Sequence, residues 1–231
     1  MLTTRFAAFV QHAWNPDTRR FRNFMSYDRR WLEDQGSEDS HGRTLWALAA
    51  CATKDADRSR RNWAKALFKA ALPAVEAFTS PRAWAFTLLA LDAYCPLAVD
   101  DASASRLRAI LADRLMTALA VRRAGGWAWF GAVLAYHNAR LPQALIQTAA
   151  TTGNTRYAVA GLRSLRWLMS QQDFIAGGAR LAALDALAAT ATPLAAPPDP
   201  APALEGDAAP EPADEVVRDI TAEVDGRRFQ V

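Results

Sequence analysis

The sequence has few cysteines and few β-branched residues. Only two cysteines, Cys51 and Cys95, occur among 231 residues, and no CxxC pair is present. Two isolated thiols exclude a disulfide framework and a cysteine-based structural metal site, so we expect both to be small buried hydrophobic residues. Val and Ile are scarce beside abundant Ala, which favours helix over strand because alanine loses the least free energy on entering a helix.

Long hydrophobic runs are also missing. Asp92 interrupts the longest apolar stretch, and Phe6 to Val10 is far shorter than the apolar core of a signal peptide. We therefore expect a cytoplasmic protein that does not bind a membrane. Hydrophobic residues still make up 51% of the chain, which is enough for one sizeable core.

The charge is divided unevenly along the chain. The net charge is +3, but the stretch from Asp173 onward contains eleven acidic and four basic residues, against 13 acidic and 23 basic before it. The two parts therefore carry −7 and +10. A basic folded part can attract nucleic acid or other polyanions. Its arginines are scattered among Trp, Leu and acidic residues, however, so we predict a mixed surface and no nucleic-acid partner.

Composition predicts three segments. Residues 1–172 carry well-spaced apolar and aromatic residues and form the predicted folded domain. Residues 173–215 are acidic and rich in Ala and Pro, which is typical of a flexible linker or disordered tail, although residues 179–190 could still form a short helix. Residues 216–231 alternate like a strand and contain a turn signal at Asp225-Gly226, and we expect no partner strand after it.

Apolar spacing predicts helices throughout residues 1–172. Apolar residues at i, i+3, i+4 and i+7 mark amphipathic helices around 45–52 and 107–119. Ser80-Pro81 predicts an N-cap and a helix start. Gly153-Asn154 predicts the end of one helix and the start of the next, which runs to about Gln171. The predicted class is all-α, with about seven helices in antiparallel hairpins.

A weak internal repeat accompanies three of the predicted helix starts. His41-Gly42-Arg43, Ser80-Pro81-Arg82 and Asn138-Ala139-Arg140 each place an arginine in the expected first turn, directly ahead of an apolar run. A cation near a helix N-terminus interacts unfavourably with the helix dipole, which costs roughly 0.3–1 kcal/mol of stability. An arginine in this position usually interacts with a carboxylate or a bound anion. Pairing with a neighbouring Asp or Glu and a shared functional face both explain the repeat.

One stretch combines aromatic and acidic residues as sugar sites do. Residues 21–43 contain, in order, Trp31, Glu38, Asp39, His41 and Arg43. A pyranose offers apolar faces for stacking and hydroxyl groups for carboxylate acceptors, so the stretch fits a saccharide site. An ordered loop that caps a helix bundle, with Asp39 or Ser40 as an N-cap, fits equally well.

A second stretch crowds aromatic residues ahead of a predicted helix. Residues 125–140 open with a double glycine and contain Trp127, Trp129, His137, Asn138 and Arg140. A pair of tryptophans near the mouth of a helical hairpin suits carbohydrate stacking. Core packing explains the same residues, and the sequence leaves both interpretations open.

Four runs within residues 2–172 carry a resemblance to a known family: FRNFMSYDRRWLEDQGSEDSHGRTLWAL, SPRAWAFTLLAL, WAWFGAVLAYHNARLPQAL and GLRSLRW. They resemble bacterial six-hairpin-glycosidase-like (α/α) toroid proteins, which occur beside or fused to glycosyltransferases. The resemblance implies a closed ring of six helical hairpins, with a cleft at the N-terminal ends of the inner helices. It would place Arg43, Arg82 and Arg140 on one face.

The resemblance also implies a function in carbohydrate handling. The implied domain is carbohydrate-active or carbohydrate-binding, in a glycosyltransferase or polysaccharide pathway. Its implied partners are a saccharide or glycan, and a glycosyltransferase or the rest of the toroid, with no metal or organic cofactor. We expect Trp31, Trp127 and Trp129 to stack on sugar, and His137, Asn138 and the three arginines to bind hydroxyl or anionic groups. Glu38 and Asp39 are the catalytic candidates, with His41 as a proton carrier.

The chain departs from the family's pattern at the expected carboxylates. Gly131 and Ala132 stand where acidic residues are expected, and His137 stands where an Asp is expected. Glycoside hydrolysis ordinarily needs two carboxylates, so we predict impaired or no catalysis. The chain is also too short for six hairpins, so we predict an incomplete toroid. The alternative is a non-catalytic helical-repeat scaffold that binds a protein partner through its exposed half-ring face.

Overall fold

The computed structural model describes residues 2–121, 129–132, 134–171, 221–224 and 227–230. These residues belong to two compact units, Met1–Asp199 and Pro200–Val231, which are described separately. The described part of the first unit is helical apart from one pair of very short strands, which confirms the predicted all-α class. The predicted linker, residues 173–215, and the short helix considered over 179–190 lie outside the described residues.

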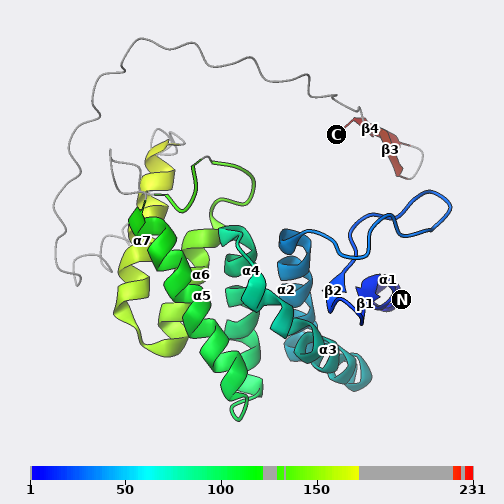
Figure 1. Ribbon diagram of the computed structural model, residues 1–231, viewed down its shortest axis with the longest axis horizontal. Helices are drawn as coiled ribbons and strands as arrows, with labels where there is room; N and C mark the ends of the chain where they lie inside the picture. The colour runs from blue at the N-terminus through cyan, green and yellow to red at the C-terminus, as the bar shows by residue number, and fades with distance from the viewer. Residues whose placement is uncertain (1, 122–128, 133, 172–220, 225–226, 231) are drawn as a thin grey trace. The chain divides into compact units, whose positions relative to one another are not determined.

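Seven α-helices follow one another in the described part of the first unit (Figure 1). They are α1 (Leu2–Ala13), α2 (Glu38–Lys54), α3 (Arg58–Ala71), α4 (Pro81–Tyr94), α5 (Ala102–Val121), α6 (Arg140–Thr152) and α7 (Thr155–Gln171). Two 3₁₀-helices, η1 (Leu72–Ala77) and η2 (Cys95–Leu97), extend α3 and α4. Strands β1 (Trp14–Asn15) and β2 (Arg20–Phe21) form an antiparallel pair after α1.

Two helix boundaries follow the cap signals of the sequence. Ser80 caps α4 by accepting a hydrogen bond from the backbone N–H of Ala83, and Pro81 occupies the first helical position. Gly153 ends α6 in the left-handed region, with φ at 74°. These positions confirm the predicted start of α4 and the predicted end of α6.

The start of α2 differs from the prediction. Ser37 is the N-cap, because its hydroxyl accepts a hydrogen bond from the backbone N–H of Ser40 at 3.1 Å, and the helix begins at Glu38. The prediction of Asp39 or Ser40 as the N-cap is therefore wrong. Arg43 consequently lies in the second turn of α2 instead of the first.

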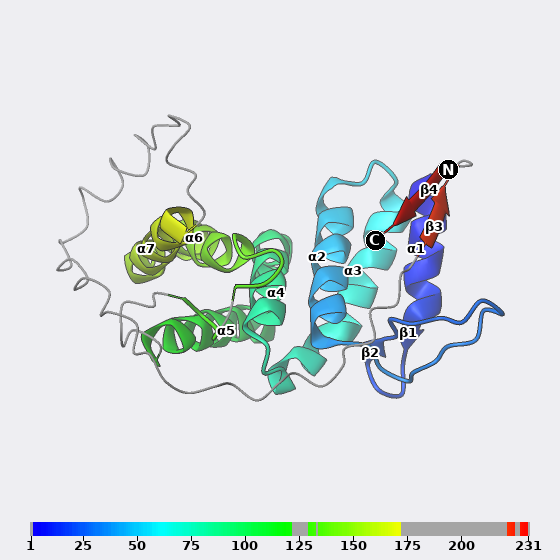
Figure 2. The ribbon, with the colours of Figure 1, turned by 90° about the horizontal axis from the view of Figure 1, so that it is seen from above.

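Helices α2, α4 and α6 lie side by side in one row and run in the same direction (Figures 1 and 2). Near the start of both helices, Gly42 of α2 faces α4 so closely that a Cβ atom added to it would lie 2.9 Å from the Ala83 carbonyl oxygen. Near the other end of α4, Asp92 accepts hydrogen bonds from the hydroxyls of Thr148 and Thr151 of α6, at 2.9 and 2.7 Å. The N-terminal ends of the three helices therefore lie next to one another, and together they form one end of the row.

Each helix of this row is followed by one that packs against it in the opposite direction, which gives the hairpins α2–α3, α4–α5 and α6–α7 (Figure 2). Gly161 allows close approach in the last hairpin, because an added Cβ atom would lie 2.7 Å from Cγ1 of Ile146 and 2.9 Å from the Pro142 carbonyl oxygen. The hairpins agree with the predicted arrangement. Their closure into a six-hairpin toroid remains a prediction.

The hydrophobic core runs through all three hairpins. It combines buried Leu and Ala side chains with aromatic rings, and the rings of Phe68 in α3 and Tyr94 in α4 stack with centroids 4.3 Å apart. Cys95 is buried, as predicted, whereas Cys51 is only partly buried. The core thus joins successive hairpins into one packed body.

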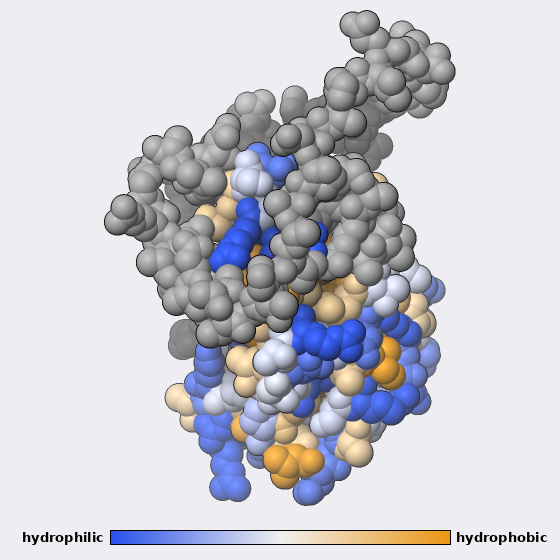
Figure 3. All heavy atoms as spheres, turned by 90° about the vertical axis from the view of Figure 1, so that its left-hand side faces the viewer, coloured by the Kyte–Doolittle hydropathy of each residue, from blue (hydrophilic) through white to orange (hydrophobic). Residues whose placement is uncertain are grey.

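The face of the molecule shown in Figure 3 is mixed in character. Hydrophilic and hydrophobic residues are interspersed in the coloured part of Figure 3, as the scattered arginines predict. No described helix combines the length and the apolar character that crossing a membrane requires.

The second unit contains a short β-hairpin among its described residues. Strand β3 (Thr221–Val224) pairs with β4 (Arg227–Gln230) in antiparallel register, with Thr221 opposite Gln230 and Val224 opposite Arg227. The prediction that no partner strand follows the turn signal is therefore wrong, because residues 227–230 supply the partner. The Asp-Gly sequence between the strands is typical of two-residue hairpin turns.

Replacing Gly42 with Ala tests the close packing of α2 and α4. The new methyl group would meet the Ala83 carbonyl oxygen at 2.9 Å and Cβ of Phe86 at 3.3 Å, so the two backbones must separate. We expect overpacking to cost about 1–3 kcal/mol and to exceed the gain of about 1 kcal/mol in helix propensity. Urea unfolding should therefore give a lower free energy of unfolding for Gly42→Ala.

The matched control for this variant is Ala47→Leu, which adds a larger side chain on the exposed side of the same helix. Its free energy of unfolding should stay within about 0.5 kcal/mol of the wild-type value. Stability of Gly42→Ala equal to or above that of the wild type would contradict the close packing.

Candidate functional site

The N-terminal ends of α2, α4 and α6 gather three arginines around aromatic side chains. The guanidinium carbon of Arg82 lies 4.3 Å from the centroid of the Tyr136 ring, and that of Arg43 lies 5.2 Å from the same centroid. Arg140 lies over the ring of Trp46 in α2, at 4.8 Å. We term this surface the arginine face and define it by Arg43, Arg82, Arg140, Asp39 and Tyr136.

Aromatic rings join the three arginines into one cluster. The rings of Trp46 and Phe86 lie 5.9 Å apart, and the guanidinium carbon of Arg43 lies 4.8 Å from the Phe86 centroid. Cation–π contacts of this kind contribute about 0.5–1 kcal/mol at exposed sites, which offsets the repulsion of a cation by a helix N-terminus. Among the described residues, a carboxylate pairs with Arg43 but not with Arg82 or Arg140.

Asp39 supplies the carboxylate of the arginine face. Its Oδ2 accepts a hydrogen bond from Nε of Arg43 at 2.8 Å, one helical turn away. Its Oδ1 is buried and accepts no hydrogen bond within the described part of the chain, and Nε of Arg82 is likewise buried without an acceptor there. Because buried polar atoms lose free energy unless they are hydrogen-bonded, both atoms retain unused hydrogen-bonding capacity beside the arginine face.

The loop before α6 brings His137 to the arginine face. The side-chain oxygen of Asn138 accepts a hydrogen bond from the backbone N–H of Ala135 at 3.1 Å, and His137 has a φ of 55°. That conformation is uncommon for residues other than Gly, although His adopts it more often than most. Nε2 of His137 lies 3.3 Å from Nη1 of Arg43. His137 is therefore part of the site's surroundings, whereas Asn138 holds the loop.

Glu38, a predicted catalytic residue, holds the start of α4. Its Oε2 accepts hydrogen bonds from the backbone N–H groups of Thr79 and Ser80, at 2.9 and 2.8 Å. The carboxylate thereby satisfies amide groups beside a helix N-terminus, where a negative charge is also favoured. Glu38 is thus engaged in joining α2 to α4.

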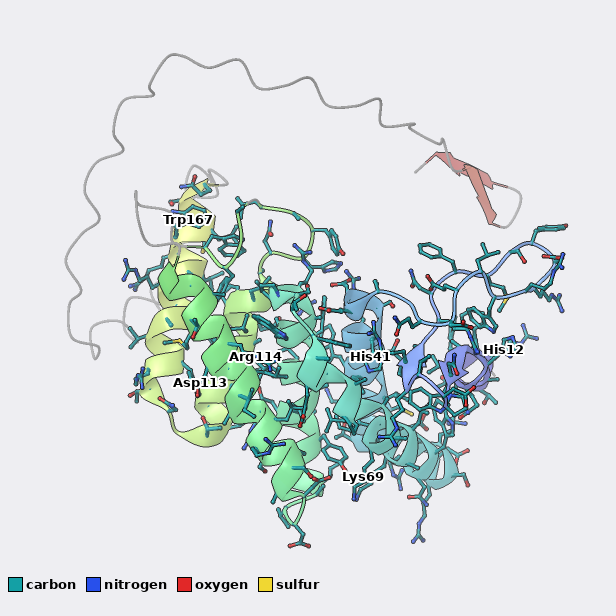
Figure 4. The ribbon with its side chains drawn as sticks, in the orientation of Figure 1. His12, His41, Lys69, Asp113, Arg114 and Trp167 are labelled. Atoms are coloured by element: carbon teal, nitrogen blue, oxygen red, sulfur yellow. The ribbon has the colours of Figure 1, made fainter. Side chains whose placement is uncertain are left out.

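His41 does not fit the role of a proton carrier that the sequence suggested. Its fully buried ring lies between Phe21 and Phe78, with centroids 5.1 and 5.2 Å away, and its Nε2 donates to the Ala71 carbonyl oxygen at 3.1 Å. Burial, reinforced by the nearby charge of Arg20, lowers the pKa of His41 to about 3. The ring is therefore neutral near pH 7 and ties α2 to the end of α3 (Figure 4).

Two of the predicted stacking tryptophans pack elsewhere. Trp31 lies against α1, with its ring centroid 5.3 Å from that of His12. Trp129 is 2% exposed and stacks on Trp167 of α7 at 5.7 Å, so the core-packing interpretation holds for it. Trp127 lies outside the described residues.

An open groove between α4 and α5 is a second surface feature. It is lined by Trp84, Ile110, Asp113, Arg114, Thr117 and Ala118. Asp113 accepts a hydrogen bond from the Tyr157 hydroxyl at 2.8 Å, and Arg114 donates to the Glu76 carbonyl oxygen at 3.0 Å (Figure 4). Both charged side chains thus hold neighbouring elements together, and the arginine face is the stronger candidate.

Comparison with known proteins adds no information about the site. No protein-family model, curated protein or solved structure matches it. The described residues also contain no group of three or more His, Cys, Asp or Glu side chains arranged to hold a metal ion.

The predicted site omitted three aromatic residues that complete the cluster. Trp46 follows Arg43 by three positions, and Phe86 follows Arg82 by four, so each lies on the same side of its helix as the arginine. Tyr136 directly precedes His137 in the loop. The helical spacing could have found the first two, but only the packing of the loop shows that Tyr136 meets two arginines.

Replacing His41 with Gln tests the buried neutral histidine. Its pKa is lowered to about 3 in the folded state, whereas an unfolded histidine has a pKa of about 6.5. As the pH falls, the unfolded state takes up the proton first. The stability from His41 is therefore complete above about pH 6.5 and is lost toward pH 3, by up to about 1.4 kcal/mol per pH unit.

Urea unfolding at several pH values between about 7 and 4.5 measures this loss. We expect the free energy of unfolding to fall more steeply for the wild type than for His41→Gln, whose amide can still donate to Ala71. Each protein is compared with its own value at neutral pH, so that any packing loss cancels. Parallel slopes would contradict the assignment.

Proposed function

We propose that residues 2–171 form a carbohydrate-binding domain of a bacterial glycosyltransferase or polysaccharide pathway, with the arginine face as its saccharide site. One observation carries the proposal. Arg43 and Arg82 meet at the exposed ring of Tyr136, beside a carboxylate, Asp39, whose buried Oδ1 has no donor among the described residues.

The arginine face offers the three kinds of contact that a saccharide needs. A sugar hydroxyl can donate to the carboxylate of Asp39, whose side chain is 18% exposed, and the guanidinium groups can donate to hydroxyl and ring oxygens. The ring of Tyr136, which is 54% exposed, suits stacking against the apolar face of a pyranose. The resemblance to six-hairpin toroids supports the same position, because it implies a cleft at the N-terminal ends of the inner helices.

Binding is proposed in preference to catalysis. Glycoside hydrolysis ordinarily uses two carboxylates, one of them as an acid. Glu38 is engaged by backbone amides, and Asp39 is paired with Arg43. His41 is buried and neutral. The described residues of the arginine face therefore support recognition better than proton transfer.

We place the domain in the cytoplasm, acting with a glycosyltransferase or with the remaining hairpins of a toroid. The free thiols of Cys51 and Cys95 support a reducing compartment.

A protein-binding scaffold is the second candidate, favoured by exposed apolar side chains near the N-terminus. Phe6 and Phe9 of α1, and Phe24 and Leu32 of the following loop, are each more than half exposed. Large exposed apolar side chains are typical of protein interaction surfaces. Dimers in light scattering, together with tryptophan fluorescence that stays unchanged across a saccharide panel, would favour the scaffold over the saccharide site.

Saccharide titration of Asp39→Asn tests the proposed function. Trp46 lies under Arg140, so tryptophan fluorescence should report binding of manno-, gluco- or uronate-containing oligosaccharides. Losing a hydrogen bond to a charged acceptor costs about 1.5–3 kcal/mol, so we expect the dissociation constant to rise at least about tenfold. Helicity measured by circular dichroism should stay unchanged.

The matched control is Asp100→Asn, which removes an exposed carboxylate beyond the opposite end of α4. It should bind saccharide like the wild type. Unchanged binding by Asp39→Asn would remove Asp39 from the site, and a wild-type chain that binds no saccharide of the panel would overturn the proposed function.

A further inference from the structure

The arginine face carries more positive charge than its carboxylates balance. Asp39 is paired with Arg43, and Glu38, the other carboxylate at this end of the row, accepts hydrogen bonds from backbone amides. Within the described ranges, no carboxylate lies at ion-pair distance from Arg82 or Arg140. These two guanidinium groups contact aromatic rings and the amide of Gln143 instead. Their charges are therefore uncompensated.

The surroundings of Arg82 raise the positive potential further. Arg82 is the second residue of α4, where the positive end of the helix dipole favours an anion. Stacking on Tyr136 leaves the N–H groups at the edge of the guanidinium plane able to donate. One of them, at Nε, is buried and has no acceptor in the described structure. A carboxylate or phosphate can accept two parallel N–H bonds from such a group.

We infer that the saccharide bound at the arginine face is acidic, with its carboxylate or phosphate group held by Arg82 and its hydroxyl groups facing Asp39. This inference rests on the proposed saccharide function and adds the chemical class of the sugar. The charge of Asp39 repels an anion, so the acidic group binds on the Arg82 side of the face. Arg43, which already donates to Asp39, adds attraction at longer range.

Pairs of sugars that share one skeleton and differ in their acidic groups test the inference. Trigalacturonate and its methyl ester form one pair, and glucose 6-phosphate and glucose form the other. Each is titrated into the full chain at low and high salt, with tryptophan fluorescence as the readout. We expect the acidic member of one pair to bind at least about tenfold more tightly at low salt, because charged hydrogen bonds are worth about 1.5–3 kcal/mol. The pair that shows the preference identifies the acidic group.

Two arginine variants test whether Arg82 is responsible for the preference for the acidic sugar. Arg82→Gln should lose the roughly tenfold advantage of the acidic sugar while still binding the neutral one. Arg106→Gln is the matched control, because Arg106 is an exposed arginine of α5 that pairs with Glu76, and it should keep the advantage. If Arg82→Gln fails to fold by circular dichroism, the salt dependence of the wild type decides, since an ionic contact weakens as salt rises.

The remaining outcomes distinguish failure of the inference from failure of the proposed saccharide function. Equal binding of acidic and neutral sugars, or a preference that salt does not weaken, would overturn the inference and leave the saccharide function standing. Binding of no member of either pair would overturn the inference, and a chain that binds no saccharide of the wider panel would overturn the proposed function as well. Polyglutamate that binds as tightly as the acidic sugar would also overturn the inference, because the attraction would then be general to anions.

Discussion

The close approach of α2 to α4 at Gly42 is the contact on which the arginine face depends. Because no side chain separates the two helices there, their N-terminal ends lie near enough for Arg43 and Arg82 to share the ring of Tyr136. At the far end of α4, Asp92 binds two hydroxyls of α6 and holds that helix in the same row. The hairpins thus position the site, and each functional side chain needs only a place in an early turn or the adjoining loop.

Charge and burial give similar residues different chemistry at this end of the row. His41 is enclosed by aromatic rings and stays neutral, while His137, a few ångströms from Arg43, lies in an exposed loop. Glu38 and Asp39 are adjacent in sequence, yet one binds backbone amides and the other binds a guanidinium group. Ligand binding at the arginine face therefore depends on which polar side chains are already hydrogen-bonded or ion-paired within the protein.

Much of the local structure could be predicted from the sequence. Ser80-Pro81 and Gly153 mark helix ends because they satisfy or terminate hydrogen bonds within one turn of themselves. The arginine repeat left two explanations open, pairing with a neighbouring carboxylate and a shared functional face. The packing of Trp31 against α1 and of Trp129 in the core could not be predicted, because an aromatic ring suits a sugar site and a core equally well until its neighbours are known.

The sequence by itself determined the all-α class, the helix boundaries at Ser80-Pro81 and Gly153, and the arginines near the leading ends of three helices. Periodicity and capping act over a few neighbouring residues, so a sequence pattern can show them. Tertiary structure alone decided that His41 is buried, that Glu38 holds α4, and that Tyr136 joins Arg43 and Arg82. It also paired β3 with β4 beyond the predicted turn. Burial and the pairing of polar groups depend on residues far apart in the chain, and their positions are fixed only when the helices pack.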